Sequence, residues 1–353
     1  MARSLLIAAA LALVSSVTAQ CGSGANAKVT GSGSSFTATK GSSTVYTGSD
    51  YRAAIQAAVD SISSGQRVSV IASGSIGAST ITISSGKIFE GCGTINTASR
   101  AGHGAIEVLN ASGVQIPHLT MTGSPYFGLR FYGTKDLVLG KITMNLSGGL
   151  GIRFDRDQAA NTNVKMDVIN VTGAGSHALE TWNIDGLTIN TVIANNVGES
   201  GLLLQKTTNA KVGLVDGNNV GAGTGYATLR FANNNGQLSS GAYTTNVVID
   251  KVVSRGGGRG VFCVSQSGGA TIGTVDLASN GNNAILIENC YNLRINGGTV
   301  NGGGEVRISA RDEFPNTKDI WITLKVDNTS VKESPCGENT NWTLSGNGAR
   351  SIC

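Results

Sequence analysis

The sequence is poor in charged residues, in proline and in aromatic residues. Charged side chains make up 14% of its 353 residues, against about a quarter in an average globular protein. The chain has 4 Pro, 8 Phe, 7 Tyr and 3 Trp, but 50 Gly. So little proline and no strict triplet period exclude collagen and argue against disorder. The formal charge of +4 is small and scattered, so we expect no nucleic-acid partner.

Long apolar segments are also missing, except at the N-terminus. Residues 1–19 contain Arg3, an apolar run from Leu5 to Val14 and small residues up to Ala19. This order is typical of a cleaved secretion signal. The run is shorter than the ~20 residues that a membrane span requires. We therefore predict a secreted, extracellular protein that begins at Gln20 and does not enter a membrane.

An even number of cysteines in a secreted chain favours disulfides. Their order suggests the pairs Cys21–Cys92, Cys263–Cys290 and Cys336–Cys353, while other pairings remain open. A metal site is not indicated, because the sequence has no C-x-x-C motif and no histidine-rich cluster. Five sequons predict N-glycosylation at Asn110, Asn145, Asn170, Asn328 and Asn341.

A short motif recurs along the chain, with a small residue followed by alternating apolar positions. Its copies begin at Ala105, Gly128, Gly151, Ala178, Gly201, Thr228, Gly260, Ala284 and Glu305, 21 to 32 residues apart. Second β-like runs and Asn/Gly clusters lie between them, and such clusters are typical of turns. A unit of this size cannot bury its apolar face alone, so stacking of successive units is predicted.

The repeat predicts an all-β fold, a single-stranded parallel β-helix. Leucine-rich repeats are disfavoured because their L-x-x-L-x-L pattern is missing, and a propeller needs a period nearer ~40 residues. We expect one domain over residues 20–353, with rungs at about 67–330. Residues 49–65 have helical periodicity, and we expect this helix to cap the first coil within an N-terminal cap of about 20–66. The tail, 331–353, would cap the other end.

From about Val68 to Val326 the rungs resemble the right-handed parallel β-helix superfamily of pectin and pectate lyases and polygalacturonase-type glycosidases. The polygalacturonase signature itself is absent. The segments that match it most nearly, each imperfectly, are Asp155/Asp157, Gly175–His177 and Val306–Ser309. The resemblance therefore implies the fold and a carbohydrate site, and does not define a reaction.

Strand alternation converts the repeat into a surface map, because successive side chains point to opposite faces. Leu129 and Phe131 are expected inside, so Arg130 and Tyr132 point outward. One outward column contains Glu107, Arg130, Arg153, Glu180, Leu203, Arg230, Phe262, Leu286 and Arg307. A second column, two residues further along, contains Tyr132, Asp155, Trp182, Gln205 and Glu288.

The map brings two carboxyl groups close together. Rung and strand spacing place Asp155 and Glu180 at roughly 8 Å, within the ~6.5–9.5 Å typical of inverting glycoside hydrolysis. In this interpretation Arg153 keeps Asp155 ionised, and Glu180, packed near Trp182, holds the proton for the leaving oxygen. His177, the third predicted catalytic residue, would orient either partner or a sugar hydroxyl. Arg130, Tyr132, Arg153, Trp182, Gln205 and Arg230 would bind the substrate.

The arginines suggest an acidic, uronate-containing polysaccharide. The main hypothesis is a monomeric hydrolase that needs no cofactor. The second is a lyase, in which Asp155, Asp157 and Glu180 would hold Ca²⁺ and Arg230 or Lys206 would act as the base. The third is a non-catalytic carbohydrate-binding or cell-wall protein. For each charged residue taken alone, a solvated cross-rung ion pair remains the simpler interpretation.

Overall fold

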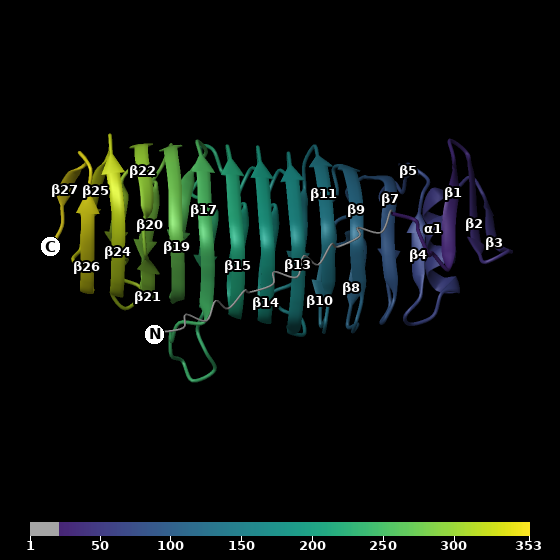
Figure 1. Ribbon diagram of the computed structural model, residues 1–353, viewed down its shortest axis with the longest axis horizontal. Helices are drawn as coiled ribbons and strands as arrows, with labels where there is room; N and C mark the ends of the chain where they lie inside the picture. The colour runs from purple at the N-terminus through teal and green to yellow at the C-terminus, as the bar shows by residue number, and fades with distance from the viewer. Residues whose placement is uncertain (1–20) are drawn as a thin grey trace, which may run out of the picture.

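A computed structural model describes residues 21–353, so the predicted signal segment 1–19 lies outside the described residues. The chain forms a parallel β-solenoid of about 12 turns, with the strands stacked along one long axis (Figure 1). The all-β prediction is confirmed. No helix in this part of the chain is long and apolar enough to cross a membrane.

The strands form three walls. The wall that bears the predicted site, called the site wall, runs from β6 to β27. Its strands are β6 (Ile81–Thr82), β8 (Gly104–Leu109), β10 (Phe127–Tyr132), β12 (Leu150–Phe154), the first residues of β14 (Leu179–Asn195) and of β15 (Leu202–Asn218), β16 (Ala227–Ala232), β18 (Arg259–Cys263), β20 (Ile285–Glu288), β23 (Val306–Ser309), β25 (Ser330–Glu333) and β27 (Ala349–Ser351).

The other two walls share several long strands that bend between them. Their members are β4 (Arg67–Val70), β5 (Gly74–Ser75), β7 (Ile88–Thr97), β9 (Gln115–Gly123), β11 (Val138–Leu146), β13 (Asn161–Thr172), the remainders of β14 and β15, β17 (Val247–Arg255), β19 (Ser267–Asn280), β21 (Cys290–Ile295), β22 (Gly298–Gly303), β24 (Lys318–Asp327) and β26 (Glu338–Ser345). Pairing skips one residue at each bend, for example at Gly140, Asn190 and Gly213.

Asparagine and glycine make the turns between walls. Asn183, Asn209 and Asn233 have φ values of 53°, 50° and 52°, a left-handed conformation that asparagine tolerates better than most residues. Gly149, at φ 71°, is required for close approach, because a Cβ there would lie 1.7 Å from the Pro125 carbonyl oxygen. These residues keep each coil in register with the next.

The core is a column of aliphatic side chains that the alternation pattern predicted. Its site-wall members are all fully buried: Ile106, Leu129, Ile152, Leu179, Leu202, Leu229, Val261, Ile285 and Val306. Phe131 and Phe154 stack on adjacent rungs with ring centroids 4.9 Å apart. With the inner positions filled by apolar groups, the polar members of each strand are left on the outer face of the wall.

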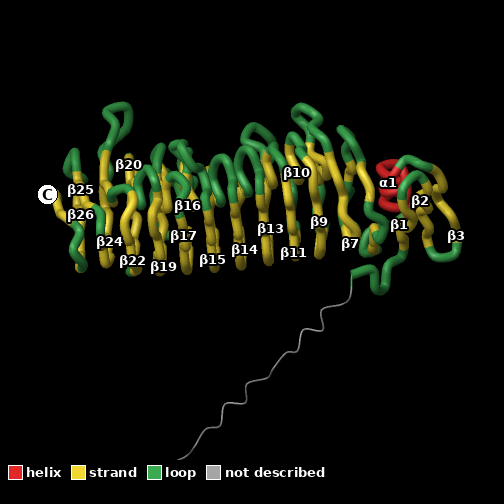
Figure 2. The backbone as a smooth tube through the Cα atoms, turned by 90° about the horizontal axis from the view of Figure 1, so that it is seen from above, coloured by secondary structure: helices red, strands yellow, loops and turns green. Residues whose placement is uncertain are grey.

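At the N-terminal end, β1 (Ala27–Ser32) pairs in parallel with β4, and β2 (Ser35–Lys40) and β3 (Ser43–Gly48) add two antiparallel strands. The one helix among residues 21–353, α1 (Tyr51–Ser61), lies within the predicted range and is capped by Asp50. It buries Tyr51 against Phe36, with ring centroids 4.8 Å apart. Figure 2 shows α1 beside β1 and β2. Figure 1 shows β2 and β3 beyond α1 at this end of the solenoid, so the role of the helix as the cap itself stays a prediction.

The three disulfides join Cys21 to Cys92, Cys263 to Cys290 and Cys336 to Cys353. The pairing predicted from cysteine order is therefore confirmed. Three disulfides and no free cysteine among residues 21–353 indicate an oxidising, extracellular environment.

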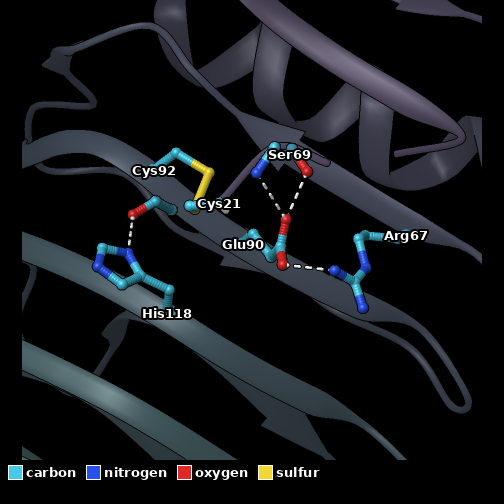
Figure 3. Close-up of a disulfide and its surroundings, with 8 residues drawn as sticks. Cys21, Arg67, Ser69, Glu90, Cys92 and His118 are labelled. Carbon is cyan, nitrogen blue, oxygen red and sulfur yellow. Dashed lines mark hydrogen bonds and ion pairs between the residues drawn. A yellow bond between two sulfur atoms is a disulfide. The ribbon is translucent and has the colours of Figure 1, made fainter. Parts of the chain in front are cut away.

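The first disulfide fixes the start of the described chain to the second coil (Figure 3). Beside it lies Glu90, which is buried and accepts hydrogen bonds from the Arg67 Nη1, the Ser69 hydroxyl and the Gly22 backbone N–H. Cys21, Glu90 and Cys92 have the spacing of a metal site, but both sulfur atoms are held in the disulfide. The cluster is therefore a structural anchor.

Candidate functional site

The site wall has the register that the sequence predicted. Glu107 pairs with Arg130, Arg130 with Arg153, and Arg153 with Glu180 on adjacent strands. The column continues through Leu203, Arg230, Phe262, Leu286 and Arg307. In the second column Trp182 pairs with Gln205. The predicted side chains therefore do share one outer face.

The first part of this face is an ion-pair ladder. Arg130 donates two hydrogen bonds to Asp155 Oδ2, at 2.9 Å from Nε and 2.7 Å from Nη2, and contacts Glu107 at 3.2 Å. Burial alone would lower the pKa of the Arg130 guanidinium, but Asp155 and Glu107 raise it above its usual value. Arg153 contacts Asp155 Oδ1 at 3.4 Å and also donates to Glu180 Oε2. One guanidinium thus joins the two predicted catalytic carboxylates.

Glu180 faces only hydrogen-bond donors. Besides Arg153, its Oε1 accepts from Trp182 Nε1 at 2.9 Å and from Gln205 Nε2 at 2.8 Å. A carboxylic acid needs an acceptor for its own proton, and these contacts provide none. These contacts satisfy Glu180 as a hydrogen-bond acceptor, and its role as the proton donor to the leaving oxygen stays a prediction.

Trp182 and Asp155 are also less open than expected. Trp182 is 9% exposed and Asp155 is 7% exposed. The Trp182 ring lies under the Arg156 guanidinium at 5.7 Å, and its Nε1 is held by Glu180. The tryptophan therefore packs within the ladder and does not offer a free platform for a sugar ring. Tyr132, half-buried, lies under Arg130 at 5.6 Å.

The calcium set of the lyase hypothesis is not assembled in this structure. Asp157 is 73% exposed and pairs with its neighbour Arg156. Asp155 and Glu180 are already occupied by Arg153. Lys206 is exposed, directly follows Gln205 at the end of the site-wall part of β15, and lines a separate cavity with Asn183 and Asp185. It is therefore not placed beside the carboxylates as a base.

His177 lies at the edge of the site wall, where the preceding turn enters β14. Its Nδ1 accepts a hydrogen bond from the Ser200 backbone N–H at 3.0 Å, so the proton of the neutral ring is on Nε2. Nε2 lies 3.1 Å from Glu199 Oε2, which also accepts from the Ser176 hydroxyl. Burial lowers the pKa of His177, although Glu180 and Glu199 oppose this effect. His177 therefore positions Glu199 and has no free lone pair.

Arg230 lies next to this group and differs from the ladder arginines. Its guanidinium stacks on Tyr226 at 4.9 Å and on Phe262 at 5.2 Å, and its Nε is buried without a hydrogen-bond partner among residues 21–353. Burial lowers the pKa of Arg230, while Tyr226 and Glu199 act in the opposite direction. Burial also raises the pKa of the Tyr226 phenol, and the Glu199 charge adds to this. The Tyr226 and His177 rings meet edge to face at 5.3 Å.

Ser176, Glu199 and Tyr226 were not identified as site residues from the sequence. Each lies two positions before a copy of the repeat, which begins at Ala178, Gly201 and Thr228. The same register argument, extended into the turn before each strand, places them in a third column. We call His177, Glu199, Tyr226 and Arg230 the Arg230 cluster.

The five sequons differ in their surroundings. Asn110, Asn145 and Asn341 are exposed. Asn170 is half-buried within β13, and its Oδ1 is buried without a partner among the described residues. Asn328 is also exposed and donates its amide to Asn301 at 2.8 Å. Access for a glycan is therefore poorest at Asn170.

Comparison with protein-family models, with curated proteins and with solved structures gives no match for this chain.

Proposed function

We propose that this protein is an extracellular enzyme that binds an acidic polysaccharide at the Arg230 cluster and cleaves it by β-elimination. The solenoid and the three disulfides support an extracellular carbohydrate-active role, as does the resemblance to the pectin and pectate lyase superfamily. The observation that carries the proposal is Arg230, a largely buried cation with an unpartnered Nε.

The other arginines at this end of the wall are already neutralised. Arg130 and Arg153 contact Asp155, Glu107 and Glu180. Arg230 instead lies between two aromatic rings and forms no ion pair within 4 Å among residues 21–353. A guanidinium of this kind is suited to a carboxylate that arrives with a ligand. A uronate is the sugar that carries such a group.

The surrounding groups suit elimination. When the uronate carboxylate pairs with Arg230, the proton on C5 becomes easier to remove. The Glu199 carboxylate would take that proton, a double bond would form between C4 and C5, and the bond from C4 to the glycosidic oxygen would break. The Tyr226 phenol, whose raised pKa keeps it protonated, would give its proton to the leaving oxygen. Return of the proton from Glu199 to Tyr226 restores both groups.

The contacts of Asp155 and Glu180 make the paired-carboxylate hydrolysis less suitable. That reaction needs one protonated carboxyl group and space for water between the pair. Here both carboxylates contact the Arg153 guanidinium, and Glu180 is further held by Trp182 and Gln205. We therefore assign the ladder a structural role and place the chemistry at the Arg230 cluster.

Product analysis tests the proposal. The purified protein should release fragments with an unsaturated end that absorbs ultraviolet light from a uronate-containing polymer, at an unchanged rate when a chelator is present. Tyr226→Phe and Glu199→Gln should each reduce the rate by about 10²–10⁴-fold, with binding retained. Tyr126→Phe is a matched control, because Tyr126 is also two positions before its repeat copy and is 44% exposed. Saturated reducing ends would instead show a hydrolase, and binding without release would show a non-catalytic protein.

A further inference from the structure

A polar cavity lies on the same wall, on the C-terminal side of the Arg230 cluster. Its volume is about 630 Å³, and it is lined by residues of the rungs from β18 to β25 that include Arg259, Leu286, Glu288, Glu305 and Arg307. Two stacking contacts connect it to the cluster. The Phe262 ring lies 5.2 Å from the Arg230 guanidinium and 4.5 Å from that of Arg259. One ligand could therefore extend over Phe262 from the cluster into the cavity.

Three of the four charged side chains that line this cavity have a charged partner, and Arg259 contacts only neutral groups. Arg307 contacts Glu305 at 3.4 Å, and Glu288 contacts Arg311 at 3.1 Å. Arg259 donates to the Asn283 side chain at 3.0 Å and to the Gly225 carbonyl. A second carboxylate entering here would meet Glu288 and Glu305, and it would have to compete with Glu305 for Arg307. Hydroxyl groups would find donors and acceptors together, such as the Arg307 guanidinium and the Glu305 carboxylate.

The structure assigns this cavity as a binding site for a neutral, hydroxyl-rich sugar unit of the polymer whose uronate binds at Arg230. Leu286 provides an apolar surface for the sugar ring. The two arginines and two glutamates that line the cavity provide hydrogen bonds, and their charges sum to zero. The inference rests on the proposed function and narrows its substrate class. The preferred polymer has a neutral sugar near each uronate, and a polymer of uronates alone is a poorer ligand.

The test compares two probes by affinity electrophoresis. One is polygalacturonate, and the other is a polymer in which galacturonate alternates with rhamnose. Wild-type protein should bind the alternating polymer more tightly. Glu305→Gln removes one negative charge and frees Arg307, so the preference for the alternating polymer should fall about tenfold. Glu313→Gln is the matched control, because Glu313 contacts Arg311 but does not line the cavity.

Each result has a separate meaning for the two proposals. Equal binding of both polymers by the wild type, or an unchanged preference in Glu305→Gln, would overturn the neutral-sugar site. The proposed function would survive that result if Arg230→Gln still abolished binding of both polymers. Failure of the wild type to bind either polymer would overturn both proposals.

Discussion

The Nε2–H of His177 points to the Glu199 carboxylate at 3.1 Å, while Nδ1 of the same ring accepts from the Ser200 backbone. Both ring nitrogens are therefore used, and the imidazole must stay neutral to keep both contacts. A second proton on Nδ1 would face the Ser200 N–H. His177 is therefore a positioning residue for Glu199, and the contacts that hold Glu199 in place depend on pH.

We predict that His177 makes the protein less stable in mild acid. Burial lowers the pKa of the folded His177 below its usual value of about 6.5. The unfolded chain then binds more protons than the folded one in the interval below about pH 6.5. The contribution of the neutral His177 to the free energy of unfolding is therefore complete above this pH, and it is lost as the pH falls towards the pKa of the folded state. Urea unfolding between about pH 5.5 and 7 measures how steeply the free energy of unfolding changes with pH.

His177→Gln should flatten that slope, because the titrating group is gone. His103→Gln is the control, since the His103 side chain is 40% exposed. An equal slope in wild type and His177→Gln would contradict the assignment. Weaker positioning of Glu199 should also lower kcat more than it raises KM, a split that a purely structural role would not produce.

A second prediction concerns Glu180. In Glu180→Gln the side-chain amide has one oxygen and one NH₂ group. If the NH₂ group faces Arg153, it opposes the Arg153 donor. If it faces the other way, it opposes the donors of Trp182 and Gln205. We expect a loss of about 1–3 kcal/mol in the free energy of unfolding, with elimination activity retained in the folded fraction. Asp157→Asn, at an exposed ion pair, should cost less than about 1 kcal/mol. Loss of activity without loss of stability would restore Glu180 as a catalytic residue.

The outward columns show how far the sequence could predict this site. Alternation in each strand and the small residue that begins each repeat were sufficient to place Arg130, Arg153 and Glu180 on successive rungs. The same pattern carries no information on which side chains bond to each other. Asp155 and Glu180 were therefore predicted as a reactive pair, whereas the Arg153 side chain between them makes a ladder.

The turns were predicted less completely than the strands. Period-two alternation ends where a strand ends, so Glu199 and Tyr226 had no assigned direction in the sequence. Their neighbour Arg230 lies within β16 and was identified. The contrast between Arg230 and the other arginines depends on the aromatic rings of Tyr226 and Phe262, which come from different rungs. Only the folded chain brings these rings together.

The three disulfides should react with reductant in a fixed order. Cys336 and Cys353 are exposed at the C-terminal end, Cys21 and Cys92 are half-buried, and Cys263 and Cys290 are fully buried. Attack by a thiolate requires access to sulfur. Limited treatment of the folded protein with dithiothreitol, followed by alkylation and mass spectrometry, should label the C-terminal pair first and the buried pair last. Early labelling of Cys263 would show that the coils open locally.

The last prediction concerns the anchor at Glu90. This carboxylate is 4% exposed and accepts from Arg67 at 2.7 Å, Ser69 at 2.6 Å and the Gly22 N–H at 3.2 Å. Glu90→Ala would leave the Arg67 charge partly buried without its partner, so we expect a loss of about 3–5 kcal/mol. Asp276→Ala, at an exposed pair, should cost less than about 1 kcal/mol. Hydrogen exchange should locate the loosening at the first coils, because solenoid units contact only their neighbours; uniform loosening along the stack would contradict a local anchor.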